Sequence, residues 1–160
     1  MHSKHSWIKN AYETEAMQEI LEKHGYEIVP FGEKADVYLI NTCSVTNIAD
    51  RKSRQMLHRA RKMNPDAVVI AAGCYVQAAG RELLQDSSVD ILIGNNEKAN
   101  LPEILKAWEE EHDASHIHDL TREHTYEELS LSHTAEHTRA YMKIQDGCNQ
   151  FCTYCIIPYT

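Results

Sequence analysis

Short apolar runs alternate with amphipathic stretches over the first two thirds of the chain. Runs such as DVYLIN and AVVIAA are partly β-branched and predict strands. Stretches in which apolar residues recur every three or four positions predict helices. The predicted strands are 26–29, 36–41, 67–72 and 90–93. The predicted helices are 11–24, 47–63, 76–84 and 97–111. This alternation indicates an α/β domain with a mostly parallel sheet flanked by helices.

Two isolated cysteines stand directly after predicted strands. Cys43 follows the run 36–41, and Cys74 follows the run 67–72. The second run is continuously apolar, as is typical of a parallel strand buried on both faces. In such sheets functional groups gather past the carboxyl ends of the strands, so the two thiols are expected at the same edge. Taken alone, each cysteine could equally be a small buried hydrophobe.

The pattern changes after residue 111. His, Glu, Ser and Thr dominate from 112 to 138 and the periodicity fades, which predicts a solvated linker rather than a histidine metal site. Residues 140–144 (AYMKI) then predict a new strand that leads into a loop. The sequence therefore predicts an α/β domain at 1–111, a linker at 112–138 and the beginning of a second domain at 139–160.

Composition and charge exclude some classes of protein. The 160 residues are 42% hydrophobic and 25% charged, as in ordinary globular domains. No apolar run approaches the roughly 20 residues of a membrane span, and the first nine residues lack the apolar core of a signal peptide. The expected location is therefore the cytoplasm. The net charge of −8 argues against a general polyanion binder.

Positive charge is nevertheless concentrated in the predicted helix 47–63. Four of its basic side chains follow helical spacing and are expected to share a face. They are Arg51, Arg54, His58 and Lys62. Such a face could contact RNA phosphates or could be an ordinary solvated surface. Tyr12 and Tyr75 could stack on bases, or be partly buried.

The densest chemical signal is a cysteine triplet near the end of the chain. Cys148, Cys152 and Cys155 follow the spacing Cys-x3-Cys-x2-Cys. An odd number of cysteines suits a disulfide framework poorly, whereas thiolates suit iron–sulfur clusters. Three ligands on a [4Fe–4S] cluster leave one iron open to a cofactor. Zinc ligation and chance clustering remain alternatives, although zinc sites usually show four ligands.

The triplet, with Tyr154 directly before its last cysteine, resembles the signature of radical S-adenosylmethionine (SAM) enzymes. More specifically, four separate segments resemble the methylthiotransferases. These segments are 10–15 (NAYETE), 41–46 (NTCSVT), 72–75 (AGCY) and 141–159. They occur in the family's order, and the similarity spans nearly the whole chain apart from its first nine residues and the linker. The last segment is most similar to the branch that acts on threonylcarbamoyl-adenosine in tRNA.

The resemblance implies an α/β domain followed by the first strand and cluster loop of a truncated radical SAM barrel. It implies that Cys148, Cys152 and Cys155 hold a [4Fe–4S] cluster, with Tyr154 beside the S-adenosyl-L-methionine that binds there. Cys43 would be one of three ligands of a second, auxiliary [4Fe–4S] cluster. The other auxiliary ligand that the resemblance identifies is Cys74.

For the intact enzyme, the resemblance implies insertion of a methylthio group into an unactivated C–H bond. The implied partners are a tRNA anticodon loop as substrate and an electron donor such as flavodoxin, with no membrane. Other branches of the family modify isopentenyl-adenosine in tRNA or an aspartate of a ribosomal protein. A different hypothesis is that the 160-residue chain is a non-catalytic fragment that binds at most a cluster or RNA.

One departure concerns the third auxiliary ligand. The family begins with a strand that ends in Gly-Cys, and Ser6 and Trp7 occupy the equivalent places here. His2 and His5 are poor substitutes, and residues 1–5 are too polar to predict a buried strand. A second departure is that most of the barrel and the RNA-binding domain are absent. We therefore expect the chain alone to be inactive.

Overall fold

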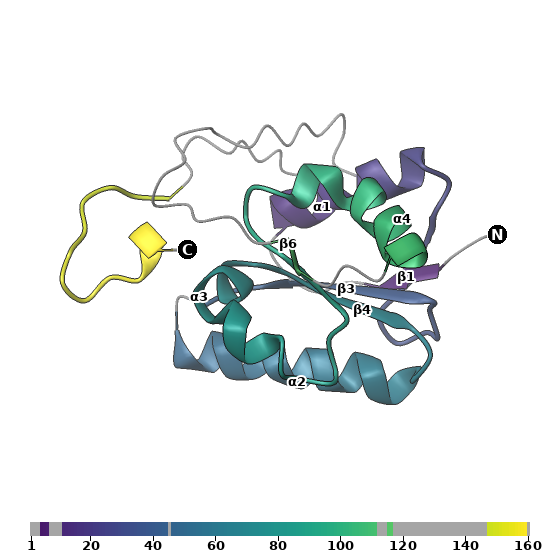
Figure 1. Ribbon diagram of the computed structural model, residues 1–160, viewed down its shortest axis with the longest axis horizontal. Helices are drawn as coiled ribbons and strands as arrows, with labels where there is room; N and C mark the ends of the chain where they lie inside the picture. The colour runs from purple at the N-terminus through teal and green to yellow at the C-terminus, as the bar shows by residue number, and fades with distance from the viewer. Residues whose placement is uncertain (1–3, 7–10, 45, 112–114, 117–146, 160) are drawn as a thin grey trace.

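A parallel β-sheet with helices on both faces forms the body of the protein (Figure 1). The structure, a computed structural model, describes residues 4–6, 11–44, 46–111, 115–116 and 147–159. The strands are β1 (Lys4–Ser6), β2 (Glu27–Ile28), β3 (Val37–Thr42), β4 (Val68–Gly73), β5 (Ile91–Ile93) and β6 (Ser115–His116). The helices are α1 (Ala11–Lys23), α2 (Asn47–Met63), α3 (Cys74–Leu83), η1 (Lys98–Asn100), α4 (Leu101–Glu111) and η2 (Ile157–Tyr159).

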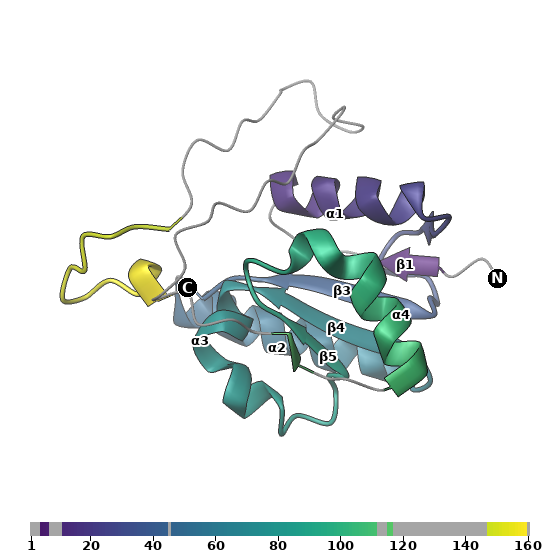
Figure 2. The same cartoon turned by 45° about the horizontal axis from the view of Figure 1, so that its top comes forward.

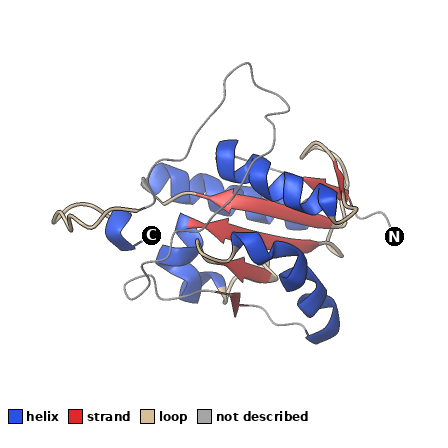
Figure 3. Ribbon diagram, turned by 90° about the horizontal axis from the view of Figure 1, so that it is seen from above, coloured by secondary structure: helices blue, strands red, loops and turns tan. Residues whose placement is uncertain are grey.

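The strands are ordered β2-β1-β3-β4-β5-β6, and each neighbouring pair is parallel. This confirms the predicted α/β class and its mostly parallel sheet. The longest pairing joins β3 to β4, from Val37 opposite Val68 to Thr42 opposite Gly73. Seen from above, the arrows of these central strands point the same way, so their carboxyl ends share one edge (Figure 3).

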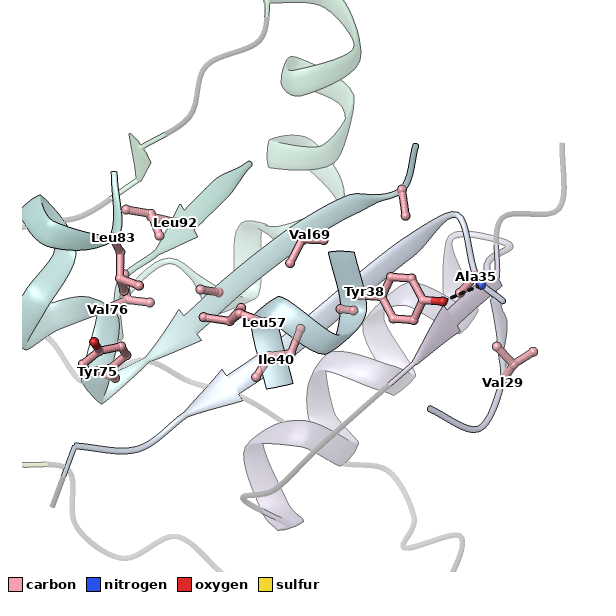
Figure 4. Close-up of a cluster of buried hydrophobic side chains, with 13 residues drawn as sticks. Val29, Ala35, Tyr38, Ile40, Leu57, Val69, Tyr75, Val76, Leu83 and Leu92 are labelled. Carbon is pink, nitrogen blue, oxygen red and sulfur yellow. Dashed lines mark hydrogen bonds between the residues drawn. The ribbon is translucent and has the colours of Figure 1, made fainter. Parts of the chain in front are cut away.

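Side chains alternate between two hydrophobic cores along β3. Tyr38 and Ile40 point into a core formed with α2 and α3, where Leu57 is fully buried (Figure 4). Val37 and Leu39 face the opposite core, which α1 and α4 cover (Figure 2). Full burial of one large aliphatic side chain stabilises a fold by about 1.5–3 kcal/mol. The two cores thus hold the central strands between helical layers.

Local signals set the ends of α2. Thr46 is its N-cap, and the Thr46 hydroxyl accepts a hydrogen bond from the backbone N–H of Ala49 at 3.1 Å. The helix ends at Met63, directly before the Asn64–Pro65 pair that was predicted to break it. Both predicted boundaries of this helix are therefore confirmed. Helix α3 begins two residues earlier than predicted, so Cys74 is its first residue.

Two strands were not predicted. Residues 4–6 form β1, which pairs with Glu27–Ile28 on one side and with Val37–Tyr38 on the other. Residues 4–6 therefore form a strand that their polar sequence did not predict, because backbone pairing on both sides fixes it. Ser115–His116, inside the predicted linker, extends the sheet beside β5. The rest of 112–138, Trp7 and the predicted strand 140–144 lie outside the described residues.

Candidate cluster-binding site

Cys43 and Cys74 follow the carboxyl ends of two neighbouring parallel strands. Thr42 ends β3 and Gly73 ends β4, and these two residues are register partners. Each cysteine is therefore one residue beyond the same level of the sheet, at its carboxyl edge, as the sequence predicted. Cys43 is exposed and Cys74 is half-buried, and both thiols are free. The placement suits two thiolate ligands that reach one metal cluster from neighbouring strands.

Gly73 makes the turn from β4 into α3 possible. Its φ of +96° belongs to a region that L side chains rarely adopt. A Cβ atom placed there would lie 2.5 Å from Asn41 Oδ1 and 2.7 Å from the Thr42 carbonyl oxygen. The two strand ends therefore approach too closely for any side chain at position 73. The chain therefore turns at Gly73, and Cys74 is the first residue of α3.

Polar groups surround the two cysteines. The Asn95 amide Nδ2 donates to Cys74 Sγ at 3.7 Å, and Asn95 is only 9% exposed. The backbone N–H of Cys43 donates to the Ser53 hydroxyl at 3.5 Å. Asn95 was missed from the sequence, because its link to Cys74 depends on the pairing of β4 with β5. An amide donor beside a thiolate is a typical neighbour of a metal-ligating sulfur.

A buried polar network lies behind the same edge. Lys98 Nζ, in η1, lies 2.8 Å from Glu13 Oε2 in the first turns of α1. Asn41 Nδ2, at the end of β3, also donates to Glu13 Oε2 at 3.4 Å. Lys98 is only 2% exposed, which is rare for a lysine unless it is paired. The network ties α1, β3 and η1 together, and no local sequence pattern predicts it.

The second group of cysteines lies in the loop 147–159, drawn in yellow in Figure 1. The Cys155 backbone N–H donates to the Cys152 carbonyl oxygen at 3.0 Å, which closes a turn between these two residues. Gly147 and Phe151 both have positive φ, at 63° and 47°. The backbone therefore bends just before Cys148, at Gly147, and again between Cys148 and Cys152, at Phe151. Phe151 also packs edge-on against Tyr159, with ring centroids 5.8 Å apart.

The loop presents its cysteines on the outside. Cys152 is exposed, Cys148 and Cys155 are half-buried, and Tyr154 is 93% exposed. The soft thiolate donors and the bent backbone fit an iron–sulfur cluster. Within the part of the chain that the structure describes, however, no three His, Cys, Asp or Glu side chains already converge on one metal position. The donor chemistry therefore fits an iron–sulfur cluster, although the three thiols do not converge on one position in this structure.

The four residues of the predicted basic face of α2 differ in their contacts: two have side-chain partners and two are exposed. Arg54 donates to the Tyr75 hydroxyl at 3.2 Å, and His58 Nε2 lies 2.9 Å from Asp86 Oδ2. Tyr75 is 4% exposed, so it is a buried residue and not a stacking platform. Arg51 and Lys62 stay exposed, as expected. No helix among the described residues is long and apolar enough to cross a membrane.

The fold is shared with a solved structure of distant sequence. A CheY-like response regulator receiver domain from Methanospirillum hungatei JF-1 matches 71% of this chain and 98% of its own, with a TM-score of 0.55. The identity is 17%, so this similarity concerns the fold alone. It supports the α/β class with helices on both faces of a parallel sheet.

Curated relatives match almost the whole chain. Threonylcarbamoyladenosine tRNA methylthiotransferase MtaB of Bacillus subtilis (strain 168) is 42% identical over 94% of this chain and 34% of its own length. Its namesake from Aquifex aeolicus (strain VF5) is 39% identical over 94% of this chain and 37% of its own. A tRNA-2-methylthio-N(6)-dimethylallyladenosine synthase of Rickettsia conorii (strain ATCC VR-613 / Malish 7) is 34% identical over 94% of this chain and 36% of its own.

The chain thus spans about a third of the length of these relatives. A family described as "Uncharacterized protein family UPF0004" matches residues 8–94, which is more than half of the chain. The matched region includes the α1 segment that carries Glu13, both edge cysteines and the close approach of β3 to β4. The chain therefore belongs to family UPF0004, and its relatives confirm the resemblance to methylthiotransferases.

Proposed function

We propose that this chain is the front part of a tRNA methylthiotransferase that acts on threonylcarbamoyl-adenosine next to the anticodon. The observation that carries the proposal is the similarity to two enzymes of that name, at 42% and 39% identity over 94% of the chain. The relative named for dimethylallyladenosine is less similar, at 34%. The order of identities favours threonylcarbamoyl-adenosine over the other adenosine derivative.

Cys148, Cys152 and Cys155 would hold a [4Fe–4S] cluster through their thiolates. When bound, such a cluster supplies the electron that cleaves S-adenosyl-L-methionine at an iron without a protein ligand. The turn closed by the Cys155 N–H and the Cys152 carbonyl keeps two ligands on one bend of the loop. Tyr154, whose side chain is 93% exposed, is free to pack against the cofactor.

Cys43 and Cys74 would contribute to an auxiliary cluster at the carboxyl edge of the sheet. Their placement one residue beyond the Thr42–Gly73 register pair supports a shared site. The Asn95 amide would hold the Cys74 sulfur in place by its N–H donor. A third thiolate does not follow from this sequence, because Trp7 stands where the family has a cysteine. The 160-residue chain by itself is therefore expected to insert little or no sulfur.

The arrangement of domains follows from the same proposal. Residues 1–111 would form the N-terminal α/β domain, 112–138 a linker and 139–160 the start of the radical SAM domain. An electron donor such as flavodoxin would reduce the radical-generating cluster. Since the proposed substrate is tRNA, the proposed site of action is the cytoplasm.

The function is tested by analysing tRNA nucleosides in the organism that encodes this chain. Deletion of the gene should abolish 2-methylthio-threonylcarbamoyladenosine and leave 2-methylthio derivatives of dimethylallyladenosine unchanged. A gene copy with Cys148→Ala should fail to restore the modification in any strain where the unmodified gene restores it. Unchanged levels of the threonylcarbamoyl derivative after deletion would contradict the proposal, and loss of the other derivative would assign the chain to that branch.

A further inference from the structure

Helix α2 carries a row of exposed basic side chains on one side. The row, here called the α2 basic face, consists of Arg51, Lys52, Arg59 and Lys62. At 3.6 residues per turn, these four positions fall within about 100° of the helix circumference. They span twelve residues, or about 16 Å along the helix axis. The face is therefore a narrow strip that runs along most of α2.

The basic face keeps its positive charge, because acidic groups neutralise other members of the helix instead. His58 pairs with Asp86 at the border of the strip, and Arg61 pairs with Asp90 away from it. Among the described residues, no carboxylate forms an ion pair with Arg51, Lys52 or Lys62. The exposed cations are thus available to an external anion.

One member of the strip is held in place by an aromatic ring. The guanidinium carbon of Arg59 lies 5.5 Å from the centroid of the Phe31 ring, a cation–π contact, and the Arg59 side chain is exposed. A guanidinium offers several N–H donors in a plane and can bind a phosphate bidentately. Asp50 is the only acidic residue in α2, although the whole chain has a net charge of −8. Positive charge is therefore concentrated on this helix against an acidic background.

The position of α2 connects the strip to the cysteine edge. The helix begins at Asn47, four residues after Cys43, and it covers the face of the sheet opposite α1 and α4 (Figures 1 and 2). The Arg54–Tyr75 hydrogen bond ties the N-terminal half of α2 to the residue after Cys74. The strip therefore starts beside the carboxyl edge of the sheet and leads away from it.

We propose that the α2 basic face binds the phosphate backbone of an RNA and guides it toward the edge that carries Cys43 and Cys74. The identity of that RNA as a tRNA rests on the proposed function. Backbone contacts of this kind give affinity and orientation without reading the sequence. Sequence and modification would be recognised elsewhere, and the face would position the anticodon arm.

The test compares two variants of the 160-residue chain that lose the same charge. One is Arg51→Gln/Lys52→Gln/Lys62→Gln, which leaves Arg59 in its contact with Phe31. The control is Lys23→Gln/Lys34→Gln/Lys106→Gln, at exposed positions outside α2, and it also removes the Lys23–Glu19 ion pair, so urea unfolding checks its stability. Binding of an unmodified tRNA transcript is measured at several salt concentrations, and urea unfolding verifies that both variants fold.

The α2 variant should bind on the order of 10-fold more weakly at low salt, and the slope of log K against log salt should fall in magnitude by about 2. The control should bind like the unmodified chain. Equal losses in both variants, no loss in the α2 variant, or no tRNA binding by the unmodified chain would overturn the proposal. Loss confined to the α2 variant, together with unchanged nucleosides after gene deletion, would support the RNA face and contradict only the proposed enzyme function.

Discussion

Buried Lys98 and partly buried Glu13 form an ion pair between parts of the chain that are 85 residues apart. The Lys98 ammonium lies 2.8 Å from Glu13 Oε2, and Asn41 donates to the same oxygen. The three residues come from η1, α1 and β3, which meet behind the edge that carries the two isolated cysteines. The pair therefore couples the start of α1, where the family motif lies, to the sheet and to the turn before α4.

Removal of the lysine charge should destabilise the fold. In a Lys98→Met variant the Glu13 carboxylate, whose side chain is 12% exposed, loses its cation, and breaking a fully buried pair costs about 3–5 kcal/mol. We expect a loss near the lower end of that range, because Asn41 still donates to Glu13. Urea unfolding followed by circular dichroism measures the change in the free energy of unfolding.

The double variant Glu13→Leu/Lys98→Met is the control for this pair. Replacing both charges with apolar groups is often nearly neutral, so the double variant should recover much of the stability lost in Lys98→Met. A double variant that is as unstable as the sum of the two single variants would show that the two side chains do not depend on each other.

Gly73→Ala should disturb the approach of β4 to β3. Residues other than glycine at a φ of +96° and a ψ of −164° cost about 1–3 kcal/mol. The new methyl group would also meet Asn41 Oδ1 at 2.5 Å and the Thr42 carbonyl oxygen at 2.7 Å. We therefore expect a clear drop in the thermal unfolding midpoint.

Gly32→Ala is the matched control, because a Cβ there would meet nothing within 4 Å. Its free energy of unfolding should stay within about 0.5 kcal/mol of that of the unmodified chain. If Gly73→Ala were as stable as Gly32→Ala, the strand ends would not be packed as closely as described.

The Asp86 carboxylate should give a small pH-dependent contribution to stability. Burial acts to raise its pKa, but hydrogen bonds from His58 and Ser88 outweigh this and hold the pKa below its usual value of 3.8. A carboxyl group with a lowered pKa stabilises the fold above its unfolded pKa, and this stabilisation disappears as the pH falls through the lower folded value.

Asp86→Asn should therefore lower stability at pH 7 by less than about 1 kcal/mol, as for other largely exposed ion pairs. The difference from the unmodified chain should shrink below about pH 4. Urea midpoints measured between pH 3 and pH 7 test this. A difference that grows as the pH falls would give the opposite sign and would contradict the assigned role of Asp86.

Much of the α/β body was predictable from local patterns. Apolar runs indicated β3 and β4, helical spacing indicated α2, and Asn64–Pro65 marked where that helix ends. Strand β1 was not predictable, because residues 4–6 are polar and form a strand only by pairing with β2 and β3. Strand β6, two residues long, likewise depends on its neighbour β5.

The candidate site was predictable in its chemistry but not in its surroundings. Cysteine spacing and position after strands identified the thiols, since parallel strands end at one edge. The contact of Asn95 with Cys74 and the Lys98–Glu13 pair join residues distant in sequence, which only the folded chain brings together. The helical spacing that grouped Arg51 with Arg54 and His58 could not show that the latter two have partners.

If Cys148, Cys152 and Cys155 hold an iron–sulfur cluster, as we propose, the iron bound by the chain should depend on these three residues. Iron, sulfide and zinc are measured after anaerobic reconstitution of the chain, of a Cys148→Ala/Cys152→Ala/Cys155→Ala variant and of a Cys43→Ala/Cys74→Ala control. We predict about four irons in the unmodified chain and in the control, and almost none in the triple variant. Bound zinc without iron, or iron that persists in the triple variant, would contradict the claim.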